Sequence, residues 1–197
     1  YIHLGMDEED ARHCGKYPYA VYRQGELFAH DLRFMIDCVA DTGAKPWIWV
    51  DLLLKYTEEY TKHFDAEDAI LSPWYYNAFR REHWTPVESR AEYVAYYNEG
   101  DYAKLGIKWV EEDPYLVNFR EIMPKLVKEG YEYVPCASVF NRCDWNHEDL
   151  VEYFKEGTPD EQIVGFMTAP WFSTKWKNKE YFDESFKFFK EAREKYY

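Results

Sequence analysis

The chain has 197 residues, a length that allows one sizeable core, and we expect a single domain over residues 1–197. Its composition, 47% hydrophobic and 31% charged, is typical of a globular protein and excludes a disordered one. A formal net charge of -13 argues against a nucleic-acid partner, and no apolar stretch approaches the ~18 residues of a membrane-spanning helix.

Five short strands are predicted, each a run of β-branched or aromatic residues beside turn-forming residues. They cover residues 1–5, 47–53, 69–75, 131–139 and 163–168. Between them, apolar residues recur at helical spacing in residues 27–39, 119–127, 150–154 and from residue 181 onward. The first three of these helices are expected to stop at or before a glycine, namely Gly43, Gly130 and Gly157. Residues 77–113 are polar and tyrosine-rich, and predict an elaborated loop with a short helix near residues 89–98.

Strands that alternate with helices pair in parallel through right-handed crossovers. The fold is therefore either an open doubly wound sheet or a closed barrel. No strand is followed by a glycine-rich phosphate loop, whereas polar or aromatic residues follow every strand. Because all strands of a (β/α)8 barrel contribute to a site at that edge, we predict an α/β fold of the TIM-barrel type, with about five β/α units present.

Two adjacent carboxylates, Asp7 and Glu8, follow the first predicted strand directly after Gly5. Neighbouring residues of a strand point to opposite faces, so both can reach one site only where the strand ends or turns. A glycine tolerates the backbone angles of such a turn. Paired carboxylates can also differ in pKa, so that one is ionised and the other is a general acid. The alternative is a solvated acidic turn at the start of a helix.

The segment His3-Leu-Gly-Met-Asp-Glu8 resembles the His-x-Gly-Gly-Asp-Glu signature of family 20 glycoside hydrolases, the β-N-acetylhexosaminidases. Met6 replaces the second glycine, as a larger residue can in the hexosaminidase D-like branch. Later segments are similar to that branch in the same order, and the resemblance covers most of the chain. They are residues 45–51, 69–76, 136–141 and 163–171, similar to the fifth to eighth barrel strands.

The resemblance implies a retaining exo-β-N-acetylhexosaminidase, in which the substrate's own 2-acetamido oxygen attacks the anomeric carbon. Asp7 would orient the acetamide and stabilise the oxazolinium intermediate, and Glu8 would act first as general acid and then as base. The substrate would be a carbohydrate with a terminal N-acetylhexosamine, and no metal or other cofactor is expected. The implied substrate-binding residues are His3, Trp49, Asp51, Trp74, Tyr76, Asn141 and Trp171.

Several of these residues also have plain packing interpretations. Aromatic residues make up 20% of the chain, and most of them are expected in the core. A lone strand histidine such as His3 is more often a core residue, and one of Trp47 and Trp49 is expected to face the helices. Arg80, Arg81 and Arg120 are expected to be solvated.

Two other functions stay open from the sequence. One is a non-catalytic carbohydrate-binding domain on the same scaffold, because a fold does not fix a function. The other is a glycosidase with a conventional carboxylate pair, such as Glu8 with Asp51.

The resemblance places the chain at strands four to eight of a barrel, with no counterpart of strands one to three. Five strands cannot close an eight-stranded barrel, and the first and last strands would be apolar edges of the kind that proteins normally cover. We therefore expect the chain to be the C-terminal part of a longer barrel enzyme, or to pair these edges with another chain. The expected partner is thus the missing half of the barrel or a second copy of the chain.

Overall fold

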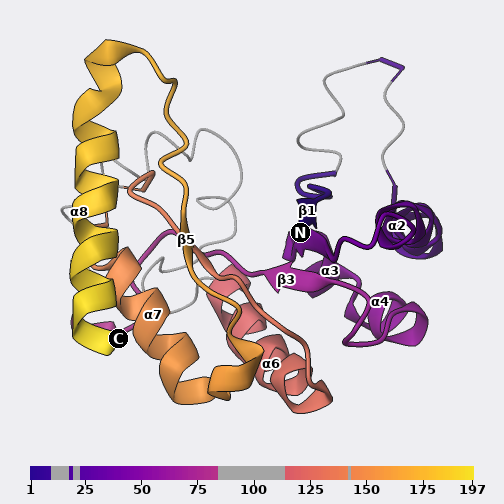
Figure 1. Cartoon of the computed structure of the whole chain (residues 1–197). Helices are drawn as coiled ribbons and strands as arrows, with labels where there is room; N and C mark the ends of the chain where they lie inside the picture. Colours follow the sequence, from indigo (N-terminus) through magenta and orange to yellow (C-terminus); the bar gives the residue numbers. More distant parts are fainter. Residues whose placement is uncertain (10–17, 20–22, 84–113, 142) are drawn as a thin grey trace. The chain divides into compact units, whose positions relative to one another are not determined.

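The computed structural model describes residues 1–9, 18–19, 23–83, 114–141 and 143–197 (Figure 1). Most of the predicted loop over residues 77–113, with its helix near 89–98, lies outside the described residues, as does Arg142. The chain divides into two compact units, each built from three stretches. Unit 1 comprises Tyr1–Trp74, Ile122–Pro135 and Gly157–Phe166, and unit 2 comprises Tyr75–Glu121, Cys136–Glu156 and Met167–Tyr197. The single domain over residues 1–197 stays a prediction.

Unit 1 is built on a parallel sheet in which the strands follow their order in the chain. Strands β1 (Ile2–His3), β2 (Pro46–Trp49) and β3 (Ile70–Ser72) pair in the order β1-β2-β3. Single parallel bridges then join Leu71 to Tyr133 and Tyr133 to Ile163. All five predicted strand regions thus contribute in chain order, although each regular strand is shorter than predicted. The closed (β/α)8 barrel stays a prediction, because chain-order pairing also occurs within an open sheet.

Helix α2 (Gly25–Ala40) connects β1 to β2 and confirms the periodic pattern of the sequence. It buries Phe28, Leu32 and Ile36 on one face and ends before Gly43, as expected. It packs beside α4 (Thr57–His63), a short helix that was not predicted (Figure 1). The 3-10 turn η3 (Asp160–Gln162) precedes the bridge residue Ile163.

The predicted strand over residues 47–53 is wrong in its second half. The strand ends at Trp49, and Asp51–Lys55 forms the short helix α3. The three leucines of α3 are all buried, and a continuous apolar run has no alternation that could separate a buried strand from a buried helix. Leucine also favours helix over strand. Asp51 is therefore the first residue of a helix, two residues beyond the strand end at Trp49.

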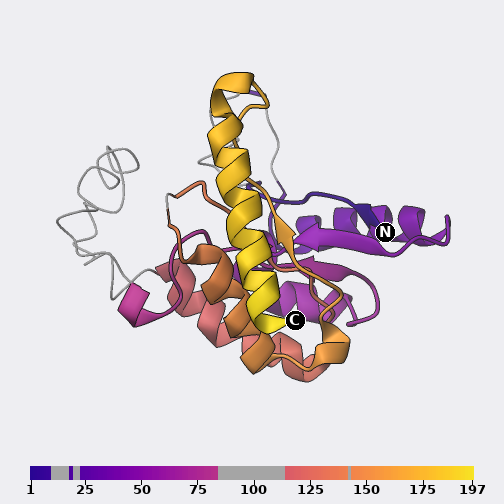
Figure 2. The same ribbon diagram turned by 60° about the vertical axis from the view of Figure 1, so that its left-hand side comes forward.

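Unit 2 contains a second parallel pair, β4 (Cys136–Ala137) and β5 (Met167–Thr168). Helix α7 (Asn146–Gly157) ends at its predicted glycine. Helix α8 (Lys179–Tyr196) packs against β5 and the 3-10 turn η4 (Trp176–Asn178), and Figure 2 shows it running beside β5. A further 3-10 turn, η1, covers Arg81–His83.

Helix α6 (Pro114–Glu129) supplies residues to both units and runs through Pro124 before it ends at the predicted Gly130. None of the described helices combines the length and the apolar character that crossing a membrane requires.

Candidate functional site

The turn that follows β1 has a strained backbone. Gly5, Met6 and Glu8 have φ angles of 76°, 70° and 50°, in the left-handed region. For residues with a side chain this region costs roughly 1–2 kcal/mol each, and it persists only where the surroundings hold it. The positive φ at Met6 gives a physical reason why the resembling signature has glycine there. Strain of this kind concentrates at functional sites, which makes residues 5–8 the first candidate.

Three hydrogen bonds hold this turn. His3 Nδ1 accepts the backbone N–H of Gly5 at 2.9 Å. The backbone N–H of Trp49 donates to the Gly5 carbonyl at 3.1 Å. At the other end, Asp51 Oδ2 accepts the backbone N–H of Glu8 at 2.7 Å. These bonds fix the turn to β1, β2 and α3. The side chains of Asp7 and Glu8 therefore project from a backbone whose position is fixed.

His3 lies between two tryptophans. Its ring centroid is 4.7 Å from that of Trp47 and 4.7 Å from that of Trp49. The expectation that one of these tryptophans faces the helices is wrong, because residues two apart in a strand share a face. Burial lowers the pKa of His3, against an opposing effect of Asp7. A neutral imidazole fits the hydrogen bond, since Nδ1 must be unprotonated to accept the N–H of Gly5.

Asp51 is a half-buried carboxyl whose hydrogen-bond donors are the N–H groups of Glu8, of Asp51 itself and of the Trp74 indole. Burial raises its pKa to about 6, the N–H of Glu8 and the indole of Trp74 oppose this by hydrogen bonding, and the charge of Asp7 adds to it. Its Oδ1 is buried, with no hydrogen-bond partner among the described residues. No Lys, Arg or His in the described ranges forms an ion pair with it. Asp51 therefore gains or loses its proton close to neutral pH.

Asp7 and Glu8 are exposed, Trp74 is half-buried, and Trp49 is buried at 9% exposure. Two carboxylates open to solvent beside a third with a raised pKa can give and take protons on a bound molecule. Unit 1 thus brings together His3, Asp7, Glu8, Trp49, Asp51 and Trp74.

The other three predicted residues belong to unit 2. Tyr76 is buried, its ring lies 6.5 Å from that of Trp171, and its hydroxyl is hydrogen-bonded to Trp171 and Cys136. Burial raises the pKa of Tyr76 well above its ordinary value. Trp171 is 48% exposed and has a φ of 59°, a further strained residue at a predicted site position. Asn141 donates to Asn77 Oδ1 at 3.3 Å.

A buried polar cluster around Asp149 was not predicted. Asp149, 1% exposed, accepts the backbone N–H groups of Phe79 and Arg80 at 2.8 and 3.0 Å. It also pairs with Arg80 Nε at 2.7 Å and His83 Nδ1 at 2.6 Å. Arg80 was expected to be solvated, which is wrong, because it also pairs with Glu148 and Glu152. Arg120 is exposed, as expected, and donates to the Phe79 carbonyl.

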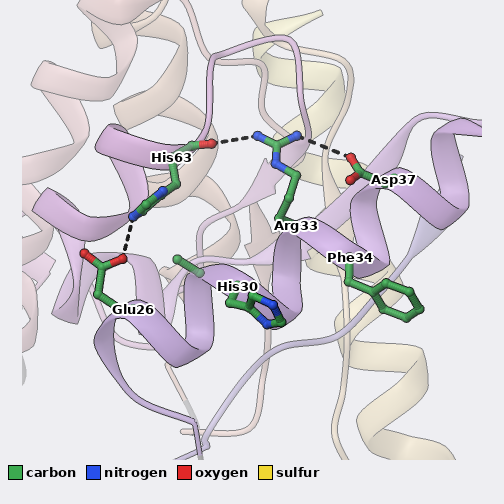
Figure 3. A pocket seen from close by; sticks show the side chains of 7 residues that line it. Glu26, His30, Arg33, Phe34, Asp37 and His63 are labelled. Carbon is green, nitrogen blue, oxygen red and sulfur yellow. Dashed lines mark hydrogen bonds and ion pairs between the residues drawn. The ribbon is translucent and has the colours of Figure 1, made fainter.

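A pocket of about 470 Å³ lies on the surface of α2 and α4 (Figure 3). Its charged groups already have partners: Glu26 pairs with Lys62 and His63 at 2.7 Å each, and Arg33 pairs with Asp68 at 2.7 Å. It contains none of the predicted site residues, so we place the candidate site at the strained turn instead. The pocket is lined by Glu26, Ala29, His30, Arg33, Phe34, Asp37 and His63.

The sequence matches no protein-family model and no curated protein, and the structure matches no solved structure. Within the described residues, no group of three or more His, Cys, Asp or Glu is placed to hold a metal ion. Function therefore has to be inferred from the chemistry of the turn and its neighbours.

Proposed function

We propose that the protein is a retaining exo-β-N-acetylhexosaminidase that removes terminal GlcNAc or GalNAc by substrate-assisted catalysis. One observation carries the proposal: two adjacent carboxylates, Asp7 and Glu8, stand exposed on a strained turn at the carboxyl end of a parallel strand. Ligands of parallel sheets bind at that edge, in open sheets and barrels alike. The chain-order pairing of the five strand regions supports the barrel as the scaffold.

Each carboxylate has one role in this reaction. Asp7 orients the 2-acetamido group, whose oxygen attacks the anomeric carbon and forms a cyclic oxazolinium ion. Glu8 gives a proton to the departing glycosidic oxygen as that bond breaks. Glu8 then takes a proton from the water that opens the oxazolinium ion, which regenerates the acid and retains the configuration.

The neighbouring aromatic residues fit a sugar site to different degrees. Trp74 is half-buried and its indole N–H is engaged by Asp51, which fixes the plane of the ring. Trp49 is largely covered and contacts His3, so its main part is to support the histidine.

Hydrolysis of an aryl β-N-acetylglucosaminide tests the proposal. We expect the protein to release the aryl group and Glu8→Gln to lower kcat by about 10²- to 10⁴-fold, the usual contribution of a general acid–base. Glu58→Gln removes another exposed carboxylate of unit 1, on α4, and should leave kcat unchanged. Hydrolysis that survives Glu8→Gln at the wild-type rate would refute the assignment. Sugar binding without hydrolysis would indicate a non-catalytic carbohydrate-binding domain.

A second candidate is favoured by Asp51, whose pKa of about 6 suits a general acid near neutral pH. In that case Glu8 and Asp51 act as a conventional carboxylate pair and need no help from the substrate. The matching aryl β-glucoside, which lacks the acetamide, separates the two. Equal rates on both substrates favour the pair, whereas loss of the β-glucoside reaction favours substrate assistance.

A further inference from the structure

The contact between Asp51 and Glu8 joins a side chain to a backbone across 43 residues of sequence. Asp51 Oδ2 lies 2.7 Å from the backbone nitrogen of Glu8, so it accepts a hydrogen bond from the residue whose carboxylate is proposed to react. Trp74 holds the Asp51 carboxyl in turn. Asp51 is thus placed to act on Glu8 through the main chain.

The backbone of Glu8 needs such a partner, because its φ of 50° is unfavourable for a residue with a side chain. His3 holds the same turn at Gly5, three residues earlier. A charged acceptor makes a stronger hydrogen bond to an N–H than a neutral one does. The ionised form of Asp51 therefore holds the strained turn more firmly than the protonated form.

We propose that Asp51 is a positioning residue for Glu8, and that its ionised carboxylate holds the turn in the conformation that aims the Glu8 side chain at the substrate. Protonation of Asp51 weakens the bond to the Glu8 N–H and lets the turn relax. Among the described residues, the titratable group that acts on Asp51 is Asp7 on the turn, which in turn acts on His3 of β1, while Glu8 and Trp74 each supply an N–H. The inference rests on the proposed function only where catalysis is the readout.

The pH range follows from the environment of Asp51. Burial raises its pKa to about 6, so the ionised form, and with it the firm turn, becomes dominant as the pH rises through 6. Asp7 strengthens this effect, because its negative charge disfavours a second one nearby. At pH 5 the turn is held mainly by His3 and the Trp49 N–H.

The backbone amide of Glu8 reports directly on its hydrogen bond to Asp51, and the measurement needs no substrate. In ¹⁵N NMR spectra from pH 4.5 to 7.5, we expect the Glu8 amide proton to shift with a midpoint near pH 6. Asp51→Asn keeps an acceptor oxygen, so the amide should stay protected from exchange while the midpoint disappears. Asp51→Ala should raise the exchange rate of the Glu8 amide at least ~10-fold, as a lost hydrogen bond of ~1.4 kcal/mol implies. The control His3→Gln should leave the midpoint in place.

Kinetics give a separate readout in the same protein. We expect Asp51→Ala to lower kcat about 100-fold with little change in KM, the cost of a misplaced catalytic group. A rise in KM at unchanged kcat would instead make Asp51 a substrate ligand and would overturn the inference. If the wild-type protein does not hydrolyse the substrate, the proposed function fails while the amide titration still decides the role of Asp51. A Glu8 amide that responds neither to pH near 6 nor to Asp51→Asn would overturn the inference outright, even if Asp51→Ala does not fold.

Discussion

Asp51 in unit 1, half-buried, and Asp149 in unit 2, fully buried, are both aspartates that accept backbone N–H groups, yet their surroundings differ. Asp149 accepts two backbone N–H groups and also pairs with Arg80 and His83. Asp51 receives the backbone N–H groups of Glu8 and of Asp51 itself and the indole N–H of Trp74 but no cation among the described residues, and its Oδ1 has no partner there. A buried carboxylate is stabilised by cations and donors, so Asp149 is built as a charged structural group.

The difference separates a structural site from a candidate functional one. Asp149 ties the segment of Phe79 and Arg80 to α7, and both of its carboxylate oxygens accept hydrogen bonds in doing so. Asp51 has no cation partner within the described ranges and lies beside exposed acids on a strained backbone, and burial raises its pKa to about 6. A carboxyl of this kind lowers stability at neutral pH, which is typical of groups kept for function.

The largest expected effect is that of replacing Asp149, the structural aspartate. Asp149→Ala should lower the free energy of unfolding by about 3–5 kcal/mol, because it removes the acceptor of Arg80 Nε and of the backbone N–H groups of Phe79 and Arg80. Urea unfolding followed by circular dichroism measures this. Asp183→Ala, which removes only an exposed i,i+4 partner of Lys179, should change the value by no more than about 0.5 kcal/mol. If Asp149→Ala lowered the free energy of unfolding by less than 1 kcal/mol, Asp149 would not be the structural group that distinguishes it from Asp51.

Asp51→Asn should raise the free energy of unfolding at neutral pH, whereas Asp149→Ala lowers it. The pKa of Asp51 in the folded protein, about 6, is above its ordinary value of 3.8, so the folded state binds the proton more tightly. Its contribution to stability is therefore full below pH 4 and is lost as the pH rises through 6, at a cost of about 3 kcal/mol. Asparagine avoids this cost but buries an amide N–H₂, so we expect a net gain of about 1–2 kcal/mol at pH 7.5.

The control for this prediction is the same pair of proteins at pH 4.5, where wild-type Asp51 is mostly protonated. There the gain should vanish or become a small loss. Unfolding curves that show the same difference at both pH values would mean that Asp51 does not titrate as its burial implies.

The smallest effect concerns the turn itself. Glu8→Gly should raise the free energy of unfolding by about 0.5–1 kcal/mol, because glycine adopts a φ of 50° without strain and the Glu8 side chain is exposed. The same change should abolish hydrolysis, since it removes the proposed acid. Glu8→Ala loses the carboxylate but keeps the strain, and it should give no gain. If Glu8→Ala also raised the free energy of unfolding, repulsion between carboxylates, and not backbone strain, would be what destabilises this turn.

The sequence was informative where a pattern is local. Helical periodicity predicted α2, α6 and α7 together with their glycine ends, because one buried face is enough to mark a helix. Local pattern could not separate strand from helix in the leucines of α3, since all of them are buried. The adjacent acids after Gly5 marked the turn, but not that Met6 and Glu8 are strained, because φ is set by the contacts of the fold.

Contacts between distant segments could not be predicted from residue types. The bond from the Glu8 N–H to Asp51 depends on the register of β1 against β2 and on the start of α3. The cluster around Asp149 depends in the same way on bringing residues 79–83 to α7, and neither stretch has a motif that marks it. Arg80 was expected to be solvated because an arginine next to another arginine gives no sign of a buried partner.

The most direct test of the account is to locate where a mimic of the oxazolinium intermediate binds. A thiazoline derived from N-acetylglucosamine should be titrated into the ¹⁵N-labelled protein while the backbone amide shifts are followed. We predict that the perturbed amides include residues 3–8, Asp51 and Trp74, and that Asp7→Asn weakens the binding, because Asp7 is proposed to hold the acetamide-derived ring. Binding that perturbs the α2 and α4 pocket around Arg33 and leaves the turn unchanged would contradict the account, as would the absence of any binding.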